Sequence, residues 1–327
     1  MGRAAPVTFL RSCVLGFGIA LTPFAWAQAQ EHYPSRVVTI VVPITPGTAV
    51  DIQARLYAEG LSKRGYQVIV ENKPGAGTLI GAETVAKASA DGYTLLFTNS
   101  AHAILGTMNK NLPFDPIGDF AGVCLTGQAP AIVTVPRSLG VRTLREFITL
   151  AKAKPGTINY GSAGIGTATH LAGAYFAYKT DTQLMHVPYT ITQGIITDLL
   201  AGTIQATFSP EAFTLAFLKD GRLLGLAVAS DTPISDSIQI PTAASEGVDY
   251  IYSTWYGFLA PGKTPPAVLK KLHEDIVEAS KDPDLQNKIR LQGIDPASIG
   301  LANFDAYVRK DVERLAPLLA SIAQSKQ

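Results

Sequence analysis

Short runs of β-branched and aromatic residues alternate along most of the chain with stretches that have the spacing of an amphipathic helix. The runs predicted as strands are residues 37–42, 67–70, 93–98, 158–160, 184–187, 204–208 and 223–228. Each run except the last leads through a short loop to a helix start. This alternation is typical of an α/β protein with open, mostly parallel sheets that have helices on both faces.

Threonine marks two of these helix starts. Thr48 is followed three residues later by Asp51, and Thr143 is followed by Glu146 at the same spacing. In such a capping box the hydroxyl accepts a hydrogen bond from the third amide, while the acidic side chain reaches back to the amide of the threonine itself. We therefore expect helices to begin at these two threonines, and the first to end near Gly65.

Proline follows a hydroxyl side chain at two later positions, Ser209-Pro210 and Thr264-Pro265. Because proline is tolerated at the first helical position, both hydroxyls are predicted to cap a helix. The C-terminal segment is predicted to contain helices only, with a break at Pro296 before the last helix, which starts near Asn303. These helices are expected to pack on the first sheet.

Two longer extended stretches, residues 120–135 and 250–259, do not fit the alternation. If both cross between two sheets, the chain enters a second lobe and then returns to the first. The division predicted on this basis is lobe 1 at residues 33–130 and 256–327, lobe 2 at 131–255, and a two-strand hinge near 121–136 and 250–260. The alternative is that both stretches are edge strands of one large sheet.

The first 27 residues have the pattern of a secretory signal peptide. Arg3 and Arg11 precede an apolar stretch at residues 13–24, and Ala25-Trp26-Ala27 then provides the small residues that signal peptidase requires. The apolar part is about a dozen residues long, whereas a membrane-spanning helix needs about 20. We therefore expect an exported protein that does not insert into the membrane after cleavage; the alternative is a retained anchor.

Charge excludes partners that carry many negative charges. The 327-residue chain has 27 basic and 26 acidic residues, and the signal peptide removes two of the basic ones. Such a protein has no basic field to hold a nucleic acid or an anionic membrane. Cys124 is the one cysteine that follows the signal peptide, and its apolar neighbours predict a buried thiol.

Candidate chemistry gathers in the loops that follow predicted strands, because ligands of open α/β sheets bind beyond the carboxyl ends of the strands. Five such loops are rich in Gly, Ser and Thr and contain no Lys or Arg: residues 43–48, 99–103, 162–167, 189–192 and 209–210. An anion bound there must be held by amides, hydroxyls and helix N-termini.

Two glycine-rich segments resemble nucleotide-binding loops but lack what those loops need. The segment at residues 161–166 is followed by Thr167-Ala168 where a phosphate loop requires Lys and Ser or Thr. The glycines at residues 75–81 have the spacing GxGxxxG, and a tight turn capped by Thr78 explains them. We therefore expect no cofactor.

A serine hydrolase is the enzymatic alternative, with Ser162 as nucleophile and His170 or His186 as base. Tyr160, however, occupies the first glycine position of a nucleophile elbow, and no other pattern completes a triad. The five histidines are scattered, and the chain contains neither HExxH nor CxxC. We therefore expect no metal site and no catalytic residue.

Several motifs together resemble one family over nearly all of the chain that follows the signal peptide. They are Tyr33-Pro34-Ser35-Arg36, Val42-Pro43-Ile44-Thr45-Pro46-Gly47-Thr48-Ala49-Val50-Asp51, Val70-Glu71-Asn72-Lys73-Pro74-Gly75-Ala76-Gly77, Ala90-Asp91-Gly92-Tyr93-Thr94, Leu112-Pro113-Phe114-Asp115-Pro116, Tyr160-Gly161-Ser162-Ala163-Gly164, His186-Val187-Pro188-Tyr189 and Asp198-Leu199-Leu200-Ala201-Gly202. In this order they resemble the Bug-type periplasmic receptors of tripartite tricarboxylate transporters.

This resemblance implies a two-lobed periplasmic binding protein of type II. Each lobe is then a mixed sheet flanked by helices, and the lobes close on a small carboxylate that is delivered to integral membrane transporter subunits. A monomer is expected. The alternative partner is a signalling kinase, for which the same protein would serve as a ligand sensor.

The resemblance also implies which residues bind the ligand. A first group in lobe 1 contains Ile44, Thr45, Thr48 and Asp51, with Ser100 and His102 beside them. A second group contains Ser162, Ile165, Gly166, Thr167 and Thr169, with Tyr189, Thr190 and Ser209 nearby.

Four positions depart from the family pattern. Ile44 replaces an aromatic residue, Thr48 a glycine, Thr190-Ile191 a Lys-Gly pair, and Ser209-Pro210 an Asp-Asn pair. The changes remove one possible positive and one possible negative charge from the site, so selectivity does not transfer from relatives. We expect a di- or tricarboxylate with an apolar or aromatic body between polar ends.

Overall fold

The computed structural model describes residues 1–2, 33–108, 111–231 and 239–324. Every helix and strand below belongs to the unit Tyr33–Gln327. The predicted signal peptide, apart from Met1 and Gly2, lies outside the described residues. Within the described ranges, no helix combines the length and the apolar character needed to cross a bilayer.

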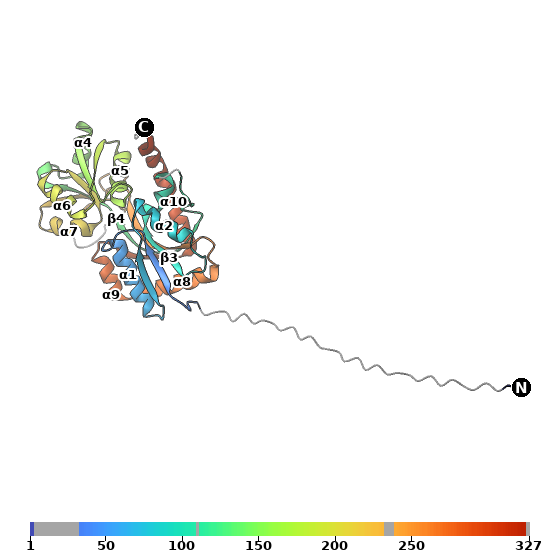
Figure 1. Ribbon diagram of the computed structural model, residues 1–327. Coiled ribbons are helices and arrows are strands. Elements are labelled where there is room, and N and C mark those ends of the chain that lie inside the picture. The colour runs from blue at the N-terminus through green and yellow to red at the C-terminus, as the bar shows by residue number, and fades with distance from the viewer. Residues whose placement is uncertain (3–32, 109–110, 232–238, 325–327) are drawn as a thin grey trace. The chain divides into compact units, whose positions relative to one another are not determined.

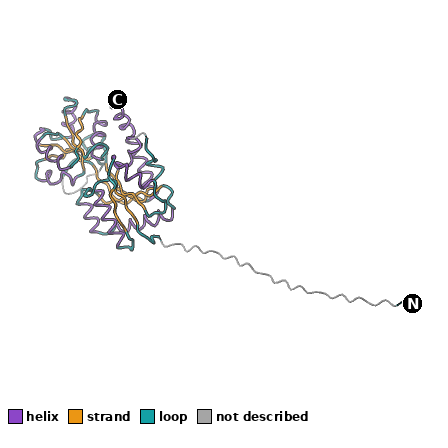
Figure 2. The backbone as a smooth tube through the Cα atoms, viewed as in Figure 1, coloured by secondary structure: helices purple, strands orange, loops and turns teal. Residues whose placement is uncertain are grey.

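The first of two sheets has six strands and helices on both faces (Figures 1 and 2). In spatial order the strands are β11 (Asp295–Ile299), β4 (Phe120–Pro130), β10 (Ser253–Pro261), β3 (Thr94–Asn99), β1 (Val38–Val42) and β2 (Val68–Asn72). β1 runs parallel to β2 and β3, whereas β10 is antiparallel to β3 and β4. The sheet is therefore mixed.

Alternation along β1 produces a hydrophobic core on each face of this sheet, because successive side chains point to opposite faces. Ile40 and Val42 pack with α1 (Ala49–Ser62), α8 (Pro266–Ala279) and α9 (Pro283–Arg290). Val41, between them, packs with α2 (Leu79–Ala86) and α10 (Leu301–Gln324). The expected packing of the C-terminal helices on the first sheet is confirmed.

The second sheet has five strands. In spatial order they are β7 (Leu184–Pro188), β6 (Ile158–Ser162), β8 (Ala206–Ser209), β5 (Ile132–Pro136) and β9 (Leu223–Val228). Its helices are α4 (Leu144–Ala153), α5 (Ala168–Thr180), α6 (Thr192–Ala201) and α7 (Glu211–Lys219). β6 is parallel to β7 and β8, and β5 is antiparallel to β8 and β9. The predicted α/β fold with two mixed sheets is confirmed, and all seven predicted strands are present within two residues of their expected ends.

Hydrogen bonds join the two segments that connect the sheets. β4 ends at Pro130 and β5 begins at Ile132, so the stretch predicted at residues 120–135 is two strands, one in each sheet. Between them, the amide of Ala131 donates to the carbonyl of Tyr252, 3.0 Å away, in the segment that leads into β10. The two connections therefore lie side by side, as a two-strand hinge requires.

The prediction that the C-terminal segment contains helices only is wrong. β11 pairs antiparallel with β4 at the edge of the first sheet, and its register shifts between Pro296 and Ile299. Proline is compatible with an edge strand because it need not donate to a ladder there. Pro296, expected to break a helix, therefore lies within a strand.

The predicted caps at Ser209 and Thr264 are also wrong. α7 starts at Glu211 and α8 at Pro266, so Pro210 and Pro265 themselves occupy the residue before each helix. Both prolines have extended ψ values, 154° and 138°, which place the preceding hydroxyl one residue too far from the first free amides. Within the described part of the chain, the Ser209 and Thr264 hydroxyls are buried and have no hydrogen-bond partner.

Candidate functional site

A cavity of about 220 Å³ lies where loops of the first sheet meet the start of α5. The first-sheet loops contribute Pro43, Ile44, Thr45, Pro74, Gly75, Gly77, Thr78, Asn99 and Ala101, and the α5 start contributes Gly166, Thr167 and Ala168. None of these side chains carries a charge. The first-sheet residues follow the carboxyl ends of β1, β2 and β3, the position at which α/β proteins bind ligands.

The N-terminus of α5 lines this cavity, and two glycines shape the loop that leads into it. Gly164 and Gly166 have φ angles of +115° and +81°, which a residue with a Cβ atom rarely adopts. Thr167 Oγ1 accepts a hydrogen bond from the amide of His170 at 3.4 Å and donates to the carbonyl of Gly164 at 2.7 Å. The first amides of α5 lack partners within the helix and carry partial positive charge, so they can bind an anion.

A hydrogen-bonded pair, the buried Ser162 and the half-buried His186, lies behind this loop. The distance between Ser162 Oγ and His186 Nε2 is 2.6 Å, and the amide of Gly164 donates to Ser162 Oγ at 3.1 Å. Ser162 is fully buried and is not among the residues that line the cavity. Burial lowers the pKa of His186, so its ring is neutral at physiological pH. The Ser162 hydroxyl therefore links His186 to the loop at residues 162–167 and stabilises the conformation of that loop.

Thr48 and Asp51 hold the first loop rather than line the cavity. Thr48 Oγ1 accepts from the amide of Asp51, as predicted, but the Asp51 carboxylate accepts from the amide of Gly47 at 2.9 Å instead of from that of Thr48. It also accepts from Asn72 and from Arg55. Burial alone would raise the pKa of Asp51, but these hydrogen bonds outweigh it and lower the pKa.

Glu146 departs from the predicted capping box in the same way. Its carboxylate accepts from the amide of Arg142, the residue before the Thr143 cap. In both boxes the threonine therefore acts as predicted, whereas the acidic side chain binds one residue further upstream. This upstream hydrogen bond fixes the residue that precedes each N-cap against the first turn of the helix.

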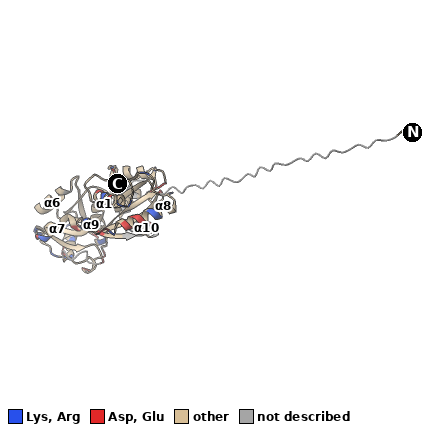
Figure 3. Ribbon diagram, turned by 90° about the horizontal axis from the view of Figure 1, so that it is seen from below, with Lys and Arg blue, Asp and Glu red and all other residues tan. Residues whose placement is uncertain are grey.

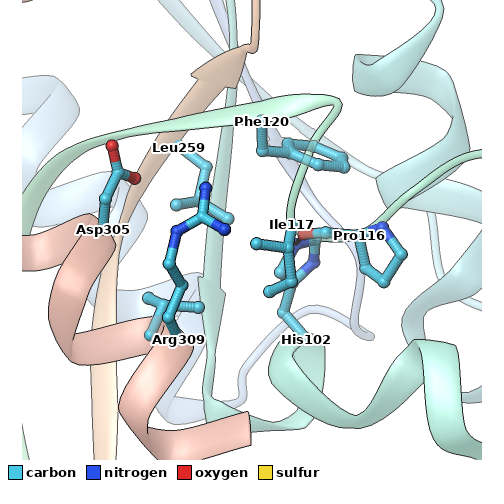
Figure 4. Close-up of a pocket in the computed structure, with 8 residues that line it drawn as sticks. His102, Pro116, Ile117, Phe120, Leu259, Asp305 and Arg309 are labelled. Carbon is cyan, nitrogen blue, oxygen red and sulfur yellow. Dashed lines mark hydrogen bonds between the residues drawn. The ribbon is translucent and has the colours of Figure 1, made fainter.

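Ser100 and His102 follow β3 in a short 3-10 helix, Ser100–Ile104, and both are buried. His102 lines a second, much smaller cavity together with Asp305 and Arg309 of α10 (Figure 4). Its Nε2 lies 2.8 Å from the carbonyl oxygen of Pro116, and its ring packs against Phe120. Burial lowers the pKa of His102 to about 4.

The remaining predicted residues have varied surroundings. The Tyr189 hydroxyl donates to Asp198 at 2.5 Å, and Thr169 Oγ1 accepts from the amide of Ala163 at 3.0 Å. Ile165 and Thr190 are exposed, and Ser209 is buried. Of the residues predicted for the site, four line the 220 Å³ cavity: Ile44, Thr45, Gly166 and Thr167.

The cavity is also lined by Pro74, Gly75, Gly77 and Thr78, and sequence reasoning treated this segment only as a turn. The expectation that Thr78 caps this turn is wrong, because its side chain makes no capping hydrogen bond. The available signal was its position, since the loop follows the carboxyl end of a strand next to β1.

Elsewhere on the surface, basic side chains pair with acidic neighbours. Lys270 lies 3.9 Å from Glu274 on α8, and Lys288 lies 2.7 Å from Asp284 on α9. Figure 3 shows that Lys and Arg (blue) and Asp and Glu (red) occupy short segments of a mostly uncharged ribbon. In the described part of the chain, no three His, Cys, Asp or Glu side chains are placed to hold a metal ion. Cys124 is buried, and burial raises the pKa of its thiol to about 12.

Comparison with known proteins gives one family. A family model described as "Tripartite tricarboxylate transporter family receptor" matches residues 53–323. A UPF0065 protein of Agrobacterium vitis is 32% identical over 324 residues, which cover 97% of this chain and 94% of that protein. Protein BugT of Bordetella pertussis is 28% identical over 307 residues, covering 93% and 94%.

Solved structures agree with this relationship. One described as a periplasmic transporter has a TM-score of 0.76 and 32% identity, with 90% of this chain and 98% of that chain covered. A Rhodopseudomonas palustris protein solved with adipate has a TM-score of 0.76 and 27% identity, covering 88% and 97%. The periplasmic binding protein BugD has a TM-score of 0.75 and 28% identity, covering 88% and 98%.

Proposed function

This chain belongs to the tripartite tricarboxylate transporter family of receptors, and from that premise we propose that it binds a small carboxylate outside the cytoplasm and delivers it to an integral membrane transporter. The observation that supports the binding role is the uncharged cavity at the start of α5. A carboxylate there would accept hydrogen bonds from the first amides of α5, with Thr167 beside it.

Energy considerations indicate how such a cavity reaches useful affinity. A helix terminus contributes about 0.3–1 kcal/mol, and about 2 kcal/mol when partly buried. Micromolar affinity requires about 8 kcal/mol. Hydrogen bonds from hydroxyl groups and burial of the carbon skeleton of the ligand must supply the rest. Without a fixed cation in its walls, the site also releases its ligand readily when the cavity opens.

The proposed ligand is a dicarboxylate with an apolar middle. The walls of the cavity combine Pro43, Ile44, Pro74 and Ala101 with hydroxyl and amide groups at its edges. Such walls favour a hydrocarbon body between polar ends. Adipate, which the R. palustris relative was solved with, has this chemistry.

Binding is proposed to proceed without any covalent step. Ser162, the candidate nucleophile, is fully buried and does not line the cavity. His186 has no carboxylate among its hydrogen-bond partners in the described ranges, so the pair lacks the orienting group of a catalytic triad. A role in positioning the loop at residues 162–167 accounts for both side chains.

Export to the periplasm is proposed from the signal-like pattern at residues 1–27 and from the family. Two of the similar solved structures are described as periplasmic. A pull-down from solubilised membranes of the native host tests the partner. Recovery of transporter subunits is expected, whereas recovery of a sensor kinase alone would contradict the transport role.

Thermal unfolding with a ligand series tests the binding role itself. The series contains di- and tricarboxylates, aromatic diacids and amino acids. A ligand that binds only the folded state raises the free energy of unfolding by about 2.7 kcal/mol at 100 times its Kd, so at least one carboxylate should raise the melting temperature with concentration. Absence of any shift across the series would contradict the proposal.

A further inference from the structure

The start of α2 differs from every other part of the cavity wall. It follows a short 3-10 helix, Ala76–Thr78, and Thr78 has φ 83° and ψ −5°. This left-handed conformation is unfavourable for a β-branched residue, and such strain is characteristic of functional sites. Thr78 is only 8% exposed, and its hydroxyl has no hydrogen-bond partner within the described ranges. The chain thus places an unused hydroxyl group in the wall of the cavity.

The two helix N-termini of the first sheet's loops differ in how their charge is balanced. At the start of α1, Thr48 caps the helix and the Asp51 carboxylate supplies a negative charge. At the start of α2, no side chain caps the helix, and its first turn contains no acidic residue. The amide of Leu79 already donates to the carbonyl of Ala76, but no acidic side chain offsets the remaining partial positive charge at the start of α2, whereas Asp51 offsets that of α1.

Asn99 provides a further donor in the same cavity wall. Asn99, at the end of β3, lines the same cavity and uses its Oδ1 to accept from the amide of Ala101 at 3.0 Å. Its Nδ2 group is therefore the part of the side chain left to donate. The α5 start, with Thr167 and Ala168, lines the same cavity.

We propose that the start of α2 binds a second carboxylate of the ligand, with Thr78 Oγ1 donating to it, so that Thr78 makes the cavity selective for dicarboxylates over monocarboxylates. The inference rests on the proposed function, because it assumes that the first carboxylate binds at the start of α5. It places the second group at α2 rather than at the loop around Thr48.

The test measures binding by calorimetry with α,ω-dicarboxylates from succinate to suberate and with the monocarboxylate of the same length as the tightest of them. Thr78→Val removes the hydroxyl and keeps the side-chain shape. Its dicarboxylate affinity should fall by about tenfold to a hundredfold, the usual effect of one hydrogen bond to a charged group. Its monocarboxylate affinity should stay unchanged, and Thr78→Ser should restore dicarboxylate binding.

Two further variants protect the test against misfolding. Thr78→Gly removes both the hydroxyl and the backbone strain, so it should raise the melting temperature and still weaken dicarboxylate binding. Thr84→Val is the matched control on the same helix, because the Thr84 hydroxyl donates to the carbonyl of Ile80 at an exposed position. Its affinity should equal that of the wild type.

The outcomes separate this inference from the proposed function. If the wild type binds none of the carboxylates, the proposed function is overturned together with the inference. If the wild type binds a dicarboxylate and every Thr78 variant binds it equally well, only the inference fails. Equal weakening for the dicarboxylate and the monocarboxylate would also overturn it, because Thr78 would then shape the cavity without recognising a second charge.

Discussion

Ser162 Oγ and His186 Nε2 lie 2.6 Å apart, at hydrogen-bonding distance, with Ser162 buried and His186 half-buried beneath the loop that leads to α5. The rings of His186 and His170 are 4.2 Å apart, and His170 Nδ1 accepts from the amide of Gly166 at 3.3 Å. Serine and histidine therefore connect the second sheet to the part of the loop that lines the cavity. The hydrogen bond between Ser162 and His186 should therefore contribute to the free energy of unfolding.

Ser162→Ala should lower the free energy of unfolding by about 1–3 kcal/mol, because His186 and the amide of Gly164 both lose a buried partner. Chemical denaturation of the two proteins measures the difference. Hydrolysis of a series of activated esters should be equally slow in both. A wild-type esterase activity that disappears in the variant would instead identify Ser162 as a nucleophile.

Thr48 and Thr167 form a natural matched pair for testing the cavity. Each accepts from the third amide at 3.4 Å, and each donates to the carbonyl three residues earlier, at 3.1 Å and 2.7 Å. Thr48→Val and Thr167→Val should each lower the free energy of unfolding by about 1 kcal/mol, as expected for loss of an N-cap. Only Thr167 lines the cavity, so only its variant should bind the carboxylate more weakly.

Calorimetry with the carboxylate identified by thermal unfolding measures this second difference. A loss of about tenfold in affinity is expected for Thr167→Val, and a change below twofold for Thr48→Val. Equal losses in both variants would mean that Thr48 itself contacts the ligand. Unchanged affinity in both would move the binding site away from this cavity.

The low pKa of the buried His102 predicts that the free energy of unfolding decreases in mild acid. Burial lowers its pKa to about 4, whereas an unfolded histidine titrates near 6.5. As the pH falls below 6.5, the unfolded chain takes up a proton that folded His102 does not accept, so the free energy of unfolding decreases until about pH 4. The full decrease from this one group is about 3 kcal/mol.

The comparison with His102→Gln isolates this effect from the other groups that titrate in the same range. Asp305 and Arg309, which line the same small cavity, are unchanged in the variant. Urea unfolding between pH 7 and pH 4 should therefore show a steeper decrease for the wild type than for His102→Gln. Parallel curves would contradict the assignment of the low pKa to His102.

Hydrophobic alternation predicted the strands well because buried strands must carry apolar side chains on a period of two or in continuous runs. β11 was missed for the opposite reason. It contains Pro296, lies at the edge of the first sheet, and pairs with β4 in a register that shifts between Pro296 and Ile299. Its position depends on contacts with β4, which lies far away in sequence, and no local pattern encodes those contacts.

The cavity was only partly predictable for a similar reason. Strand ends identified the loops that contain Ile44 and Thr167, which line the cavity. The pattern did not reveal that Asp51 compensates its own helix start, or that Thr78 adopts a left-handed conformation and leaves its hydroxyl unused. Both depend on backbone angles and on hydrogen bonds to neighbouring loops, which form only in the folded protein.

Helix α10 packs in the hydrophobic cores of both sheets, and Arg314 lies between the two contacts. Phe304 and Val308 of this helix pack in the core over the first sheet, and Leu315 and Leu318 pack in that of the second. Between these pairs, the Arg314 guanidinium lies 4.9 Å above the ring of Tyr175 of α5. The helix therefore touches both cores, with one arginine at the point of transition.

The hydrogen bonds of Arg314 explain why its loss should be costly. The guanidinium donates to the carbonyl of Ile251, 2.9 Å away in the segment that leads into β10, and to Asp311 at 2.5 Å. Asp311 is 5% exposed and also accepts from the indole of Trp255. Arg314→Met leaves this buried carboxylate without its cation, so the free energy of unfolding should fall by about 3–5 kcal/mol.

Urea unfolding followed by Trp255 fluorescence measures the loss, since the other tryptophan, Trp26, belongs to the predicted signal peptide. The Arg314→Met/Asp311→Asn double variant removes the stranded charge but keeps an acceptor for the indole. It should therefore be more stable than Arg314→Met alone, which additive losses would not produce. A double variant that loses the sum of the two single losses would show that Arg314 stabilises the helix by packing on Tyr175 rather than by neutralising Asp311.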